Sequence, residues 1–164
     1  MASTRSILRL FAERGLPPAD VLSQVNRVLV KDFPRAKFVT MIYAVIDPAS
    51  RSIVFANAGH LPPLFVDAIG SRFLEIDSGL ALGIQEVAFP EYQLDMPAGS
   101  RLLLYSDGVS EAMNSSLEEY GATRIRDHIA NSSASVQSLL DDVRTFAGGY
   151  PASDDRTVVM IRTV

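Results

Sequence analysis

The order of helical and extended segments is the feature that most constrains the fold of this chain. Residues 3–14 and 18–32 carry apolar side chains at helical spacing, and Pro18 suits the first turn of a helix. Residues 38–105 contain short runs of β-branched and aromatic residues separated by turn-forming residues. Helical spacing returns after Gly108, and residues 157–162 are expected to form a closing strand. This order predicts an α+β domain in which segregated helices cover an antiparallel sheet.

The composition excludes several classes of protein. A chain of 164 residues with 48% apolar and 21% charged residues is typical of a globular protein, and it fits one domain, residues 1–164. The net charge is -4 and the basic residues are scattered, which argues against nucleic-acid binding. Without cysteine the chain has no thiol nucleophile and no cysteine-based zinc site, so oxygen atoms are the expected metal ligands.

The hydropathy pattern predicts no membrane span. The longest apolar stretch, residues 38–46, is far shorter than the roughly 20 residues that a transmembrane helix needs. The N-terminus has neither the apolar core nor the cleavage site of a secretory signal. These observations predict a cytoplasmic protein.

Acidic residues adjoin two apolar strands that are far apart in the sequence. The run 102–105 leads directly into Asp107 and Gly108, and Asp154 and Asp155 come just before the strand at residues 157–161. Mg²⁺ and Mn²⁺ prefer carboxylate oxygens, so the two strand ends predict one shared metal centre. The alternative is turn chemistry, because Asp-Gly and Asp-Asp pairs also accept hydrogen bonds from the backbone.

A third segment places one histidine after a strand. In the sequence Asn57-Ala58-Gly59-His60, His60 is a candidate to contact a phosphate or a metal-bound water. For a lone histidine we favour the alternative that Asn57 and His60 hydrogen-bond the turn while Gly59 supplies an unusual backbone conformation. His128 lies among charged helical residues and is expected to be solvated. No histidine lies close in sequence to Ser106, which disfavours a serine nucleophile.

Together these segments resemble a known family. The chain is similar to the metal-dependent protein phosphatases (PPM, type 2C-like), and within them to the bacterial sporulation stage II E-like branch. The resemblance runs through four motifs in order along essentially the whole chain: Phe38-Val39-Thr40-Met41-Ile42-Tyr43, Ala56-Asn57-Ala58-Gly59-His60, Leu104-Tyr105-Ser106-Asp107-Gly108-Val109-Ser110-Glu111-Ala112 and Asp154-Asp155-Arg156-Thr157.

The resemblance implies a fold, an activity and a set of site residues. The implied fold is an antiparallel β-sandwich flanked by helices, with a binuclear Mn²⁺ or Mg²⁺ centre at one sheet edge. Asp107 and Asp154 match metal-binding aspartates of the family, and Asp155, Gly108 and His60 are secondary candidates. The implied activity is hydrolysis of phosphoserine or phosphothreonine by a metal-activated water in bacterial partner-switching signal transduction. The implied partner is a phosphorylated anti-sigma-factor antagonist.

The chain departs from the family pattern in one respect. Family members carry upstream a glycine-aspartate motif and an aspartate-x-x-glycine-histidine-glycine motif, and neither occurs here. We therefore expect an N-terminally incomplete phosphatase domain with a weak metal site, low activity and exposed sheet edges that favour self-association. Two hypotheses stay open: part of a metal-dependent phosphatase, or a non-catalytic phosphatase-like module that binds a partner-switching regulatory protein.

Overall fold

The fold contains two compact units, each built from helices and one antiparallel sheet. The computed structural model describes residues 2–32 and 37–164. The first unit comprises the residues up to His60 together with Ile76–Met96, and the second comprises Leu61–Glu75 and Pro97–Val164. The predicted α+β class is confirmed in both units. The assignment of residues 1–164 to one domain, and the packing of the two sheets as a sandwich, stay predictions.

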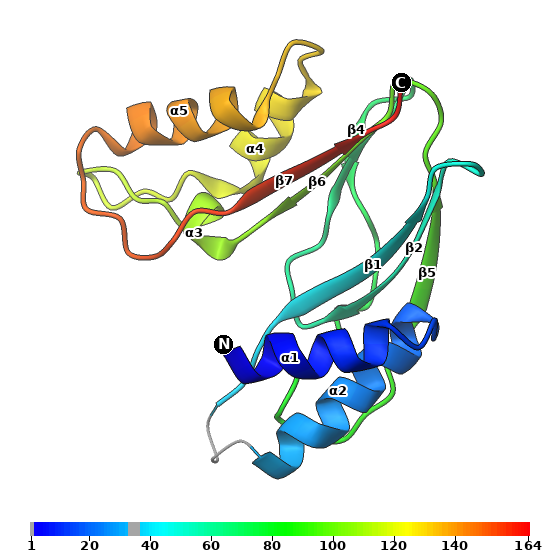
Figure 1. Cartoon of the computed structure of the whole chain (residues 1–164). Helices are drawn as coiled ribbons and strands as arrows, with labels where there is room; N and C mark the ends of the chain where they lie inside the picture. The colour runs from blue at the N-terminus through cyan, green and yellow to red at the C-terminus, as the bar shows by residue number, and fades with distance from the viewer. Residues whose placement is uncertain (1, 33–36) are drawn as a thin grey trace. The chain divides into compact units, whose positions relative to one another are not determined.

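The first unit is a helical pair on a three-stranded sheet (Figure 1). The sheet order is β1-β2-β5, and each pair is antiparallel, with Met41 opposite Ala58 and Ser52 opposite Asp95. The two helices predicted over residues 3–14 and 18–32 are confirmed as α1 and α2. The elements are α1 (Ala2–Ala12), α2 (Pro18–Asp32), β1 (Met41–Asp47), β2 (Ser52–Ala58) and β5 (Glu91–Asp95).

One stripe of α2 forms the core of this unit. Its apolar side chains repeat at helical spacing, are fully buried and pack in one cluster with Ala56 and Ala58 of β2: Val21, Leu22, Val25 and Leu29. Asn26 lies within the same helix and is also fully buried. Its side-chain amide donates to the Gln85 carbonyl, and its oxygen accepts from the Gly83 amide, both at 2.8 Å. The buried amide therefore fixes residues 83–85 to α2.

The second unit is a four-stranded sheet with helices on one face (Figure 1). The sheet order is β4-β3-β6-β7, all antiparallel, and the register of β6 on β7 runs from Arg101 opposite Arg162 to Tyr105 opposite Val158. The elements are β3 (Leu64–Val66), β4 (Ser71–Phe73), β6 (Arg101–Tyr105), α3 (Asp107–Ser110), α4 (Gly121–Ala130), α5 (Val136–Ala147) and β7 (Val158–Arg162). Side chains of β3, β6, α4 and α5 share one buried core: Leu64, Leu103, Ile125, Ile129, Leu139 and Val143.

Two strands that are close in sequence, β5 and β6, do not form a hairpin with each other. β5 and β6 follow each other through Pro97-Ala98-Gly99, yet β5 belongs to the first sheet and β6 to the second. The turn is bonded to the end of the chain instead, because the Gly99 amide donates to the Thr163 carbonyl and the Thr163 hydroxyl donates to the Pro97 carbonyl. Short sequence separation alone therefore does not make these two strands a hairpin.

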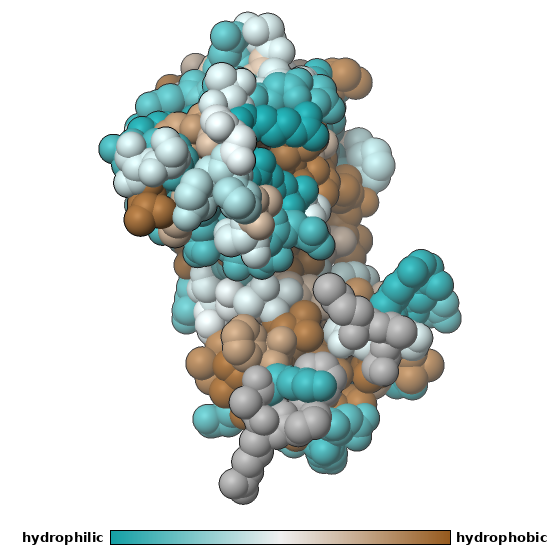
Figure 2. Space-filling model, turned by 90° about the vertical axis from the view of Figure 1, so that its left-hand side faces the viewer, coloured by the Kyte–Doolittle hydropathy of each residue, from teal (hydrophilic) through white to brown (hydrophobic). Residues whose placement is uncertain are grey.

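The surface carries both apolar and polar residues. Figure 2 shows hydrophobic residues reaching the surface between hydrophilic ones on the face that it draws. Apart from the C-terminal Val164, Ile69 is the most exposed large apolar residue in the described part of the chain, at 91%. Among residues 2–32 and 37–164, every helix is too short or too polar to cross a membrane.

Candidate metal centre

Asp107 lies where β6 ends and the short helix α3 begins. Its side chain is exposed, and its Oδ1 accepts a hydrogen bond from the Gly108 amide at 2.9 Å. The Asp107 carbonyl accepts from the Glu111 amide at 2.8 Å, which closes the turn of α3. The carboxylate is therefore held at the sheet edge by its own turn, as the turn interpretation predicts, while its remaining lone pairs are available to a ligand.

Ser106 joins this strand end to the segment that precedes β7. The Ser106 amide donates to the Thr157 carbonyl at 3.0 Å, and the Thr157 amide donates to the Ser106 hydroxyl at 2.9 Å. The same hydroxyl donates to the Asp155 carbonyl at 3.0 Å. Because its single hydrogen is used in this way, Ser106 acts as a structural clamp, which agrees with the low expectation for a serine nucleophile.

Gly108 makes the approach of the two segments possible. A Cβ added at Gly108 would lie 2.4 Å from the Asp155 carbonyl oxygen and 3.2 Å from the Asp154 carbonyl oxygen. The backbone of α3 and the backbone of residues 154–155 are therefore in direct contact. Asp107 and the Asp154-Asp155 pair, which are far apart in sequence, are brought to the same edge of one sheet.

The carboxylates at this edge suit a hard divalent cation but form an incomplete ligand set. Asp154 and Asp155 are exposed, and Asp154 Oδ1 accepts only from the Asp155 amide among the hydrogen bonds found for it, at 2.7 Å. Mg²⁺ and Mn²⁺ prefer such oxygens, yet each needs about six ligands. In the described parts of the chain, no three His, Cys, Asp or Glu side chains are grouped to hold a metal ion. The assignment of Asp107 and Asp154 as metal ligands therefore stays a prediction.

His60 lies in the first unit, on the turn that follows β2. The fully buried Asn57 donates to the His60 carbonyl and accepts from the His60 amide, both at 2.9 Å. Gly59 has φ +68°, and an added Cβ there would meet the Ala81 amide nitrogen at 2.8 Å. His60 Nδ1 also lies 3.4 Å from the Thr40 hydroxyl. The expected turn chemistry is confirmed, and the contribution of His60 to a metal or phosphate site stays a prediction.

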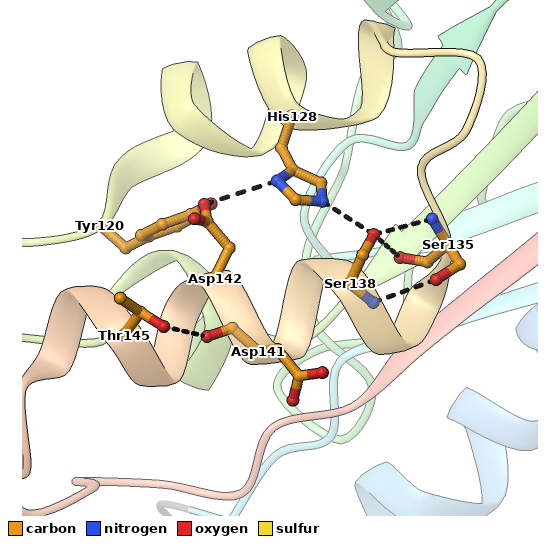
Figure 3. A network of polar contacts seen from close by, with 7 residues as sticks. All are labelled: Tyr120, His128, Ser135, Ser138, Asp141, Asp142 and Thr145. Carbon is orange, nitrogen blue, oxygen red and sulfur yellow. Dashed lines mark hydrogen bonds and ion pairs between the residues drawn. The ribbon is translucent and has the colours of Figure 1, made fainter.

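A second polar cluster joins α4 to α5 (Figure 3). His128 Nε2 lies 2.9 Å from the Ser138 hydroxyl, and its Nδ1 lies 3.5 Å from Asp142 Oδ2. The buried Tyr120 donates its hydroxyl to the same carboxylate oxygen. Burial is the main cause that raises the pKa of Tyr120, and the bond to Asp142 adds to it. The prediction that His128 is merely solvated is therefore wrong, because sequence neighbours do not show what packs across from a helix.

Ser138, His128 and Asp142 have the residue types of a nucleophilic triad, but the hydrogen bonds of Ser138 serve a different purpose. The Ser138 hydroxyl donates its hydrogen to the Ser135 carbonyl and accepts from the Ser135 amide, and the Ser135 hydroxyl accepts from the Ser138 amide. These bonds form a capping box at the start of α5. The Ser138 hydroxyl therefore serves the cap of α5, and its donor or acceptor role toward His128 depends on the histidine tautomer. The cluster is a helix cap.

Sequence reasoning missed two features of the candidate metal edge, by which we mean the end of the β6–β7 pair that carries Asp107, Asp154 and Asp155. It considered Ser106 only as a nucleophile, and the signal for its real role is the antiparallel pairing of the strands on either side. It also passed over Arg156, whose side-chain Nε is buried without a hydrogen-bond partner. No sequence pattern could have predicted the unpaired Nε of Arg156, because it depends on the direction of one side chain.

Comparison with known proteins identifies the family of this chain. The family model described as stage II sporulation protein E (SpoIIE) matches residues 1–164. The phosphoserine phosphatase RsbU of Bacillus subtilis (strain 168) is 28% identical over 155 residues, which cover 92% of this chain and 46% of RsbU. The chain therefore spans about half the length of this relative.

Two solved structures share the fold. The RsbU and RsbW domains of Rv1364c from Mycobacterium tuberculosis align with a TM-score of 0.80 at 28% identity, over 99% of this chain and 47% of that one. The PP2C phosphatase domain of SpoIIE from Bacillus subtilis, solved with a fragment of its regulatory domain, aligns with a TM-score of 0.79 at 21% identity, over 98% of this chain and 48% of that one. The chain therefore belongs to the stage II sporulation protein E (SpoIIE) family.

Proposed function

We propose that this protein is a metal-dependent phosphatase for phosphoserine or phosphothreonine, and that Asp107 and Asp154 are two of its metal ligands. The observation that carries the proposal is the direct contact of Gly108 with residues 154–155, which brings both strand-end carboxylates to one sheet edge. Mn²⁺ or Mg²⁺ is the proposed cofactor, since the donors are oxygens and the chain has no cysteine.

The proposed division of labour between the chain and the ion follows from this geometry. In sites of this kind a divalent ion supplies activation of water and neutralisation of phosphate charge. The chain supplies Asp107 from a turn closed by α3, and Ser106 holds the backbone of Asp155, the residue after Asp154, against that turn. Asp155 and Gly108 contribute through their backbones. Further oxygen ligands must come from outside this pair of aspartates.

The proposed substrate is a phosphorylated regulatory protein. RsbU, whose sequence this chain matches, is a phosphoserine phosphatase. We extend that substrate class to this chain, and specifically to an anti-sigma-factor antagonist, as the resemblance implies. A pure partner-binding module is the competing function, and the incomplete ligand set in the described residues favours it.

Metal titration separates the two functions. Calorimetric titration of the 164-residue chain with Mn²⁺ should give saturable heat, and Asp107→Asn or Asp154→Asn should weaken the affinity about tenfold or more, because each removes a charged ligand. Asp95→Asn is the matched control, since Asp95 is an exposed carboxylate on β5 in the other unit. Absence of metal-dependent heat, or equal affinity in all variants, would overturn the proposal and support the binding module. Hydrolysis of a phosphoserine peptide with Mn²⁺ is expected to be slow and to depend on Asp107.

A further inference from the structure

Arg156 carries a buried donor without an acceptor. Its Nε is one of two side-chain polar atoms in residues 2–32 and 37–164 that are buried and lack a hydrogen-bond partner, the other being the Thr4 hydroxyl. Buried donors are almost always satisfied in native proteins, and the exceptions mark catalytic groups or sites of an ion or water. A charged guanidinium is the costlier of the two to leave unpaired.

The backbone of Arg156 is fixed beside the metal edge. Tyr105 lies opposite Val158 in the β6–β7 ladder, and Ser106 continues that register by bonding to Thr157. One further step places Arg156 opposite Asp107, and the next places Asp155 opposite Gly108, where the backbone contact is observed. Arg156 is therefore held between two residues whose backbones are both bonded to Ser106.

The carboxylates around Arg156 do not neutralise it. Asp154 and Asp155 directly precede it in sequence, yet none of the ion pairs found in the described residues involves Arg156. Its side chain is only partly exposed, so water does not solvate it fully. The Nε donor of this cation is therefore unused in the structure, which leaves a charge-assisted hydrogen bond to be made to an anion at the same edge.

We propose that Arg156 binds the phosphate group of the substrate through its guanidinium. The inference rests on the proposed function and adds to it a specific anion-binding residue supplied by this chain. A guanidinium presents several N–H donors in a planar fork that matches two phosphate oxygens, which a lysine ammonium cannot do. The aspartates at the same edge repel an anion, and Arg156 offsets that repulsion close to Asp107.

The direct test follows the Arg156 Nε–Hε resonance by NMR. Uniformly ¹⁵N-labelled 164-residue chain is titrated with inorganic phosphate at neutral pH, with and without Mn²⁺, and in parallel with acetate. We expect a saturable shift of the Arg156 signal with phosphate, a weaker response to acetate and no shift of the Arg162 signal. A signal that does not move with phosphate, or that responds equally to acetate, overturns the proposal without any mutation.

Variants give a second, independent measurement. Arg156→Gln should raise the dissociation constant for phosphate about tenfold or more. The dissociation constant of Arg156→Lys should lie between those of Arg156→Gln and the unmodified chain, because lysine keeps the charge but lacks the planar guanidinium fork. Arg162→Gln is the matched control, an exposed arginine on β7 of the same unit. Equal phosphate affinity in Arg156→Gln and in the unmodified chain would refute the assignment.

Failure of the Arg156 assignment can be distinguished from failure of the proposed phosphatase function. Arg156→Gln should not weaken Mn²⁺ binding, because it removes a positive charge from this edge and leaves the carboxylates of Asp107 and Asp154 in place. Mn²⁺ binding that depends on Asp107, combined with phosphate binding that ignores Arg156, sinks this inference alone. Phosphate binding through Arg156 without any Mn²⁺ binding leaves the inference standing and sinks the metal-dependent function.

Discussion

Replacement of Gly108 by alanine should destabilise the protein through a steric clash at the candidate metal edge. The added Cβ would lie 2.4 Å from the Asp155 carbonyl oxygen, although Cβ atoms essentially never approach another heavy atom closer than 3.0 Å. The two backbones must therefore separate by about 0.6 Å, the difference between these two distances. The neighbour cannot yield freely, because the Ser106 hydroxyl holds the same carbonyl at 3.0 Å.

The expected loss of stability is about 2 kcal/mol. Overpacking of this kind costs about 1–3 kcal/mol. The strained Ser106–Asp155 hydrogen bond adds about 1 kcal/mol, and the better helix propensity of alanine returns about 1 kcal/mol. Gly108 has no positive φ to add a backbone penalty, so the clash is the only source of the loss.

Urea denaturation and Mn²⁺ titration measure the two consequences. With a typical denaturant slope of about 2 kcal/mol/M, the urea midpoint should fall by about 1 M, and Mn²⁺ affinity should fall because residues 154–155 move away from Asp107. Gly15→Ala is the control: Gly15 has φ +66° with open space around its Cβ position, so it should cost about 1 kcal/mol and leave Mn²⁺ binding unchanged. A Gly108→Ala protein as stable as the unmodified chain would refute the steric argument.

Two further variants test other buried polar groups. Tyr120→Phe removes the hydroxyl that donates to Asp142 and should cost about 1.5–3 kcal/mol at neutral pH by urea denaturation. Because burial raises the pKa of Tyr120, its contribution should be complete below about pH 10, the usual tyrosine pKa, and be lost as pH rises above it. The unmodified chain should therefore lose stability faster than Tyr120→Phe above pH 10, and parallel pH profiles would contradict this. Asn57→Ala removes the two hydrogen bonds that Asn57 makes with the His60 backbone and should cost about 2 kcal/mol, with faster hydrogen exchange at His60 as the specific signal. Unchanged exchange there would show that Asn57 does not fix the turn.

The helices and strands could be predicted from the sequence because their signals are local. The spacing of Val21, Val25 and Leu29 marks one helical face, and those side chains are fully buried in the structure. The sheet orders could not be predicted, since the pairing of β2 with β5 joins Ser52 to Asp95 across a long stretch of chain. Hydrophobic alternation says which face of a strand is buried, and it does not say which strand lies beside it.

The meeting of Asp107 and Asp154 at one sheet edge could be predicted in part, and the reason is the antiparallel pairing of β6 with β7. In an antiparallel pair the end of one strand meets the beginning of the other, so Asp107 after β6 and Asp154 before β7 share one edge. Had the two strands been parallel, the same sequence motifs would have lain at opposite edges. The motifs therefore become a site only through the register, which Ser106 extends beyond the last ladder pair and Gly108 keeps close. The same register sets Arg156 opposite Asp107, so the proposed anion-binding residue and the proposed metal ligand are brought together by a single strand pairing.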